Sequence, residues 1–119
     1  MKLEDSTKGI YKVITIYDSL SVIADLAELK TKIEEYLEKD DKYIAVKFFD
    51  ASYLYSGAIS ILITCYRMIK DKGGDLCILE PNNRILELLI QMNIDSLIDI
   101  CNSEDELLDK SAVYTRKQT

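Results

Sequence analysis

The spacing of apolar residues changes from a strand pattern to a helix pattern within the first forty residues. Residues 9–17 carry β-branched or aromatic side chains at alternate positions, the period-two signature of a strand. The polar residues 5–8 predict a turn before it, and Leu3 is compatible with a short edge strand before that turn. From Ser21 the apolar side chains gather on one helical face, which predicts a helix over residues 22–39.

Short apolar runs and longer helical patterns then alternate. Residues 43–49 form a largely apolar run, typical of a buried strand in the middle of a sheet. Residues 57–72 are apolar around most of the circumference, which predicts a helix packed on two sides. The glycine pair at 73–74 ends this helix, and residues 75–79 form the next predicted strand.

The last third of the chain continues the alternation. Apolar residues within 85–92 predict a third helix, capped by one of the two asparagines at 82–83. Residues 97–100 predict a short strand. Ser103 and Glu106 have the spacing of a capping box, in which each side chain binds a backbone amide of the other's region, so a fourth helix follows.

This order of elements predicts an α/β fold, with a mixed sheet of four to five strands covered by about four α-helices. A chain of 119 residues suits a single domain, and no linker or repeat divides it. We therefore expect one domain over residues 1–119. Residues 111–119 have little to bury, and we expect them to fray.

The charge balance argues against nucleic acid as a direct partner. Lys and Arg total 15 against 21 Asp and Glu, a formal net charge of −6, so phosphate backbones would be repelled. Charged residues at positions 2, 4 and 5 come too early for a signal peptide, and no apolar run is long enough to cross a bilayer. We expect a cytoplasmic protein without direct membrane insertion.

The residue types offer little for catalysis, and we predict that the chain is not an enzyme and uses no metal or cofactor. Histidine is absent, which removes serine–histidine and cysteine–histidine chemistry. Cys65, Cys77 and Cys101 are widely spaced in apolar sequence, as expected of reduced core thiols. A small nucleotide-binding enzyme is the weaker alternative, because the glycines at 73–74 lie before a strand, unlike a phosphate-binding loop.

Several motifs occur in the order found in the STAS domain of bacterial anti-sigma factor antagonists. Residues 46–59 resemble the STAS signature, an apolar strand and a short loop followed by Asp-Ser-Ser-Gly at the start of an apolar helix. Here the tetrad reads Tyr-Ser-Gly-Ala at residues 55–58. The further matches are residues 72–74, 80–82, 93–95, 100 and 103–104. The resemblance covers roughly residues 10–109 and implies a STAS-like fold.

The resemblance implies a phosphorylation switch. In this family the serine after the motif's aspartate is phosphorylated by a partner that is both kinase and anti-sigma factor, and Ser56 is the matching position. Tyr55 replaces the aspartate. The expected partner-binding residues lie in and just after the loops that follow the strands predicted over residues 9–17 and 43–49: Asp18, Ser19, Ser52, Tyr53, Tyr55 and Gly57. Alternatively, Ser56 is a plain helix N-cap and the two tyrosines pack under their loop.

The function that the resemblance implies is partner switching. The unmodified protein, a monomer or weak dimer, would bind a kinase-type anti-sigma factor or a related serine kinase-like regulator, with ATP bound by that partner. The alternative is a non-switching STAS scaffold or accessory subunit, as in stressosome assemblies or phospholipid ABC transporters.

Overall fold

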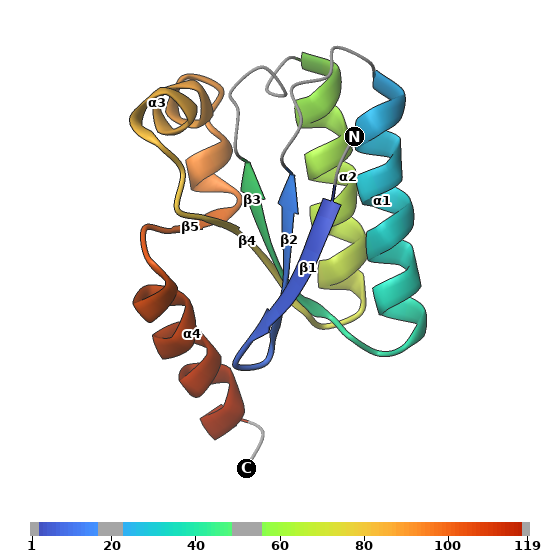
Figure 1. Cartoon of the computed structure of the whole chain (residues 1–119), viewed down its shortest axis with the longest axis vertical. Coiled ribbons are helices and arrows are strands. Elements are labelled where there is room, and N and C mark those ends of the chain that lie inside the picture. Colours follow the sequence, from blue (N-terminus) through green and yellow to red (C-terminus); the bar gives the residue numbers. More distant parts are fainter. Residues whose placement is uncertain (1–2, 17–22, 49–55, 118–119) are drawn as a thin grey trace.

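The computed structural model describes residues 3–16, 23–48 and 56–117, in which five strands and four α-helices alternate around one 3₁₀ turn (Figure 1). The elements are β1 (Leu3–Lys8), β2 (Tyr11–Ile16), α1 (Ile23–Glu38), β3 (Tyr43–Phe48), α2 (Ser56–Asp71), β4 (Asp75–Leu79), α3 (Asn83–Gln91), η2 (Ile94–Ser96), β5 (Asp99–Cys101) and α4 (Glu104–Lys117). The predicted α/β class and the order of the elements are confirmed.

The strands form one mixed sheet in the order β1-β2-β3-β4-β5. β1 runs antiparallel to β2, whereas β2, β3, β4 and β5 are parallel neighbours. Each parallel connection is therefore a crossover through a helix, as parallel pairing requires. β3 lies in the middle of the sheet, as its largely apolar sequence predicts.

The two faces of the sheet are covered unequally. One face carries the register-aligned side chains Ile14, Val46 and Ile78, which pack under α1, α2 and α3 in the larger core cluster. The opposite face carries Val13, Ala45 and Cys77 in a smaller cluster completed by α4 (Figure 1). α2 packs against both α1 and β4, which confirms that it is packed on two sides.

The start of the chain differs from the prediction. Residues 5–8 belong to β1 rather than to a turn, and the turn lies at Gly9-Ile10, where Gly9 has a φ of 59°. β1 is an edge strand whose residues 4–7 are exposed, so polar side chains cost nothing there. The prediction missed β1 because apolar and polar residues alternate only in a strand with one buried face, and residues 4–7 are exposed.

The end of the chain is more ordered than the prediction. Where we expected fraying from residue 111, α4 continues to Lys117. The buried hydroxyl of Ser111 accepts a hydrogen bond of 2.8 Å from the Ile10 amide. The Tyr114 ring lies 5.1 Å from that of Tyr43. Both contacts tie α4 to the first half of the chain, which a reading of local sequence could not reveal.

Two predicted helix caps are present. Asn82 accepts a hydrogen bond of 2.9 Å from the Ile85 amide at the start of α3. At the start of α4, Ser103 accepts a hydrogen bond of 3.2 Å from the Glu106 amide. The Glu106 carboxylate in turn accepts from the Asn102 amide, one residue before the position expected for a capping box.

All three cysteines are free and buried, as predicted. Cys65 lies on α2 in the larger core, and burial raises the pKa of its thiol to about 11. A thiol with a raised pKa is mostly protonated at neutral pH and is a poor nucleophile. Cys65 therefore acts as a small apolar core residue.

Candidate functional site

The carboxyl ends of β2 and β3 lie side by side. Their last residues, Ile16 and Phe48, are partners in the parallel register, and neighbouring strands are about 4.8 Å apart. The connections at residues 17–22 and 49–55 therefore leave the sheet from adjacent points. α1 and α2 both begin at this end of the molecule (Figure 1).

The predicted phosphoacceptor lies where an anion is physically acceptable. Ser56 is the first residue of α2 and Gly57 is the second. The first amides of a helix lack intrahelical acceptors, and the helix dipole places partial positive charge there. α2 has no acidic residue in its first turn, in contrast to α4, whose first turn holds Glu104, Asp105 and Glu106.

Five of the other predicted site residues lie outside the described residues. Asp18 and Ser19 fall in segment 17–22, and Ser52, Tyr53 and Tyr55 in segment 49–55, both outside the described residues. Only the backbone of Ser56 and Gly57 is described. The structure thus places the starting points of the two loops together, while the contacts of these side chains stay a prediction.

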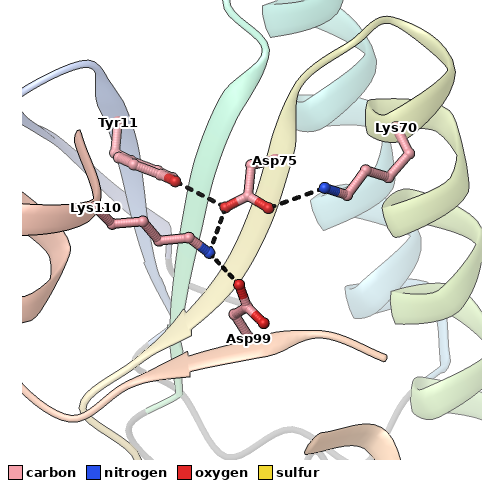
Figure 2. A network of polar contacts seen from close by, with 5 residues as sticks. All are labelled: Tyr11, Lys70, Asp75, Asp99 and Lys110. Atoms are coloured by element: carbon pink, nitrogen blue, oxygen red, sulfur yellow. Dashed lines mark hydrogen bonds and ion pairs between the residues drawn. The ribbon is translucent and has the colours of Figure 1, made fainter. Parts of the chain in front are cut away.

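A polar cluster that the sequence did not reveal is centred on a buried carboxylate at the other end of the strands (Figure 2). Asp75, the first residue of β4, is 2% exposed. Its carboxylate accepts a hydrogen bond of 2.7 Å from the Tyr11 hydroxyl and pairs with Lys70 at 3.2 Å and Lys110 at 2.7 Å. Lys110 also reaches Asp99 at 2.6 Å. The cluster joins β2, α2, β4, β5 and α4.

The electrostatics of this cluster favour a fixed charge pattern. Burial raises the pKa of Tyr11 far above its ordinary 10.0, and the hydrogen bond to Asp75 raises it further. Burial lowers the pKa of Lys110, but its hydrogen bonds to Asp75 and Asp99 outweigh burial, so the pKa lies above 10.5. Tyr11 thus stays neutral and Lys110 charged at neutral pH. Neither Tyr11 nor Lys110 is therefore poised for proton transfer near neutral pH, and their contacts with Asp75 hold β2, β4 and α4 together.

A polar hollow of about 440 Å³ lies at the carboxyl ends of β3 and β4, beside the start of α4. Its lining includes Lys47 and Glu80, whose charged groups are 3.7 Å apart, and three residues at the start of α4: Ser103, Glu104 and Asp105.

Among the described residues, no three His, Cys, Asp or Glu side chains converge as metal ligands. In the same part of the chain, no helix combines the length and apolarity needed to cross a membrane.

Comparison with known proteins agrees with this architecture. A model of the STAS domain family matches residues 8–107. The NMR structure of the protein TM1081 superposes with a TM-score of 0.80 at 16% identity, covering 94% of this chain and 90% of that one. The phosphorylated form of SpoIIAA, described as a Bacillus cell fate determinant, gives a TM-score of 0.63 at 14% identity, covering 92% and 98%. At these identities the two structures share the fold with this chain.

Proposed function

Because this chain belongs to the STAS domain family, we propose that it is a partner-switching regulator of the anti-sigma factor antagonist kind. The unmodified protein binds a kinase-type anti-sigma factor or a related serine kinase-like regulator in the cytoplasm, and phosphorylation of Ser56 releases that partner. The observation that carries the proposal is the position of Ser56 as the first residue of α2, at the carboxyl ends of β2 and β3. A similar fold has been solved in a phosphorylated form.

The start of α2 can accept a phosphate without loss of the fold. A phosphoserine carries about −1.5 to −2 charges at neutral pH and three strong acceptor oxygens. The free amides and the partial positive charge of a helix N-terminus favour such a group. Since no carboxylate occupies the first turn of α2, the phosphate meets no like charge there from the helix itself.

Release of the partner follows from charge. The chain already carries a net charge of −6, so a regulator that binds it must tolerate an acidic neighbour. Nearly two further negative charges beside the docking loops repel an acidic contact on the partner. They also disfavour an apolar contact, because burying the phosphate against it costs desolvation energy. We assign the docking contacts to the two loops, with Asp18 and Ser19 in the first, Ser52, Tyr53 and Tyr55 in the second, and Gly57 just beyond.

The direct test compares what wild type, Ser56→Glu and Ser6→Glu capture from a lysate of the source cell. Ser6→Glu is the matched control because it adds the same charge on exposed β1. Wild type and Ser6→Glu should retain a kinase-like regulator, and Ser56→Glu should retain about tenfold less of it. Mass spectrometry should find phosphate on Ser56 of the wild type.

Ser56→Ala separates phosphorylation from a simple structural effect. When the captured regulator is supplied with ATP, wild type should be released and Ser56→Ala should stay bound. If every variant retains the same partner and Ser56 carries no phosphate, the switch does not exist and the chain is a constitutive binding module.

A further inference from the structure

A groove between the carboxyl-terminal ends of α1 and α2 carries features that the proposed switch does not use. The two helices run side by side and end at the side of the molecule opposite to the start of α2 (Figure 1). The groove encloses about 330 Å³, near the lower end of the volumes found for ligand pockets. Its lining residues are Glu34, Leu37, Glu38, Met68, Asp71 and Lys72.

The floor of the groove is apolar and its rim is charged. Leu37 and Met68 are half-buried and pack against the larger core, so each presents part of its side chain to the groove. The four charged lining residues are exposed. A surface of this kind can bind an aliphatic side chain on its floor and a charged group at its rim. The methylene stem of a lysine or arginine can lie on the floor while its charged group reaches the rim.

The charge on the rim is predominantly negative and only partly compensated. Three carboxylates face one ammonium group, and within the described residues Glu34 pairs with Lys30 whereas Glu38 and Asp71 form no ion pair. Both helices also direct the negative ends of their dipoles here. α1 has no basic residue in its last turn, and α2 has Lys70, which pairs with Asp75. The groove is therefore complementary to a cationic group attached to an apolar one.

We propose that this groove binds a basic amphipathic segment of a partner protein, with an aliphatic side chain over Leu37 and Met68 and an arginine or lysine between Glu38 and Asp71. The site is separate from the phosphorylation switch. Asp71 lies 15 residues beyond Ser56 on the same helix, which corresponds to about 22 Å along the axis. The domain would then contact partners at both ends of α2.

The test uses a synthetic amphipathic peptide of about 15 residues, long enough for helix formation, with leucines on one face flanked by arginines. Titrated into the isotope-labelled protein, it should shift the NMR signals of Leu37, Met68 and their neighbours. Glu38→Lys/Asp71→Lys should weaken binding about tenfold, because two attractions become repulsions. A peptide with serine in place of leucine should bind about as weakly, because it leaves the apolar floor uncovered.

The matched control is Glu87→Lys/Asp109→Lys, which replaces two exposed carboxylates on α3 and α4. Each replacement raises the net charge by two, so both double variants carry a net charge of −2 instead of −6. The control should bind within about twofold of wild type, since distant exposed charges are screened. Equal weakening by both double variants, or signal shifts spread over all acidic surfaces, would overturn the proposal, whatever the outcome of the Ser56 experiments.

Discussion

The carboxylate of Asp75 receives contacts from residues far away in the sequence, and Tyr11 lies 64 positions from it. Nothing in the local sequence distinguishes Asp75 from an ordinary strand residue, and Lys110 stands within an acidic helix. Such a cluster becomes visible only when the sheet brings the starts of β2, β4 and β5 to the same end, with β3 between β2 and β4. Sequence patterns report burial and periodicity, whereas ion-pair partners depend on tertiary contacts.

Replacement of Asp75 by Asn should destabilise the fold by about 2 kcal/mol. Breaking a buried ion pair leaves uncompensated charge and costs about 3–5 kcal/mol, but Lys70 is 39% exposed and Lys110 keeps Asp99, so part of that cost is avoided. Urea unfolding followed by circular dichroism measures the change. Glu34→Gln, which breaks the exposed pair with Lys30, is the control and should cost at most about 0.5 kcal/mol.

Alkaline pH should weaken the fold through the same cluster. Folding raises the pKa of Tyr11 and of Lys110, so the unfolded chain loses these protons first, near the ordinary values of 10.0 and 10.5. Their contribution is complete below about pH 10 and is lost as the pH rises beyond it. The free energy of unfolding should fall there by about 1.4 kcal/mol per pH unit for each proton.

Tyr11→Phe isolates one of these protons. Above pH 10 its free energy of unfolding should decline less steeply than that of wild type, by about one proton. Tyr36, whose pKa burial also raises, contributes equally to both proteins. Identical slopes in the two urea series would show that Tyr11 ionises in the folded protein as it does in the unfolded chain.

At the scale of elements, the periodicity of apolar residues predicted the helices and strands that bury one defined face. The helices α1 and α2 and the central strand β3 begin and end within one or two residues of the predicted bounds. The errors fall where burial is weak. β1 is polar and exposed. The strand predicted over residues 97–100 is instead the three-residue β5, Asp99–Cys101, which follows the 3₁₀ turn η2.

The two glycines between α2 and β4, Gly73 and Gly74, are required for different reasons. A Cβ on Gly74 would lie 1.9 Å from the Lys42 carbonyl oxygen, which already accepts a hydrogen bond from Asp75, whereas a Cβ on Gly73 meets nothing within 4 Å. A clash with backbone cannot be relieved by rotating a side chain. Gly74→Ala should therefore destabilise the domain by about 3 kcal/mol or more.

Gly73→Ala is the matched comparison in urea unfolding. Gly73 has a φ of 81°, so alanine there is strained but not blocked, at a cost of about 1–2 kcal/mol. Similar losses for the two variants would mean that the turn can move away from Lys42, and that the close approach is not what requires glycine at position 74.

At the scale of the whole molecule, the order of the elements and the family resemblance together predicted a mixed sheet of four to five strands, and the sheet has five. The candidate site was predictable in one respect, since parallel strands bring their carboxyl ends to one edge and the loops after β2 and β3 start there together. Neither the Asp75 cluster nor the acidic groove could be predicted, because both are made by side chains whose neighbours come from other elements.

The hydrogen bond between Ile10 and Ser111 spans 101 positions, and it has a consequence for how the protein is made. A ribosome adds about 5–20 residues per second, so α4 emerges roughly 5–20 s after β2. During that interval the growing sheet face, first Val13 and Ala45 and later Cys77, has no helix to cover it. The nascent chain is then most vulnerable to aggregation, and the packing of α4 on this face ends that exposure.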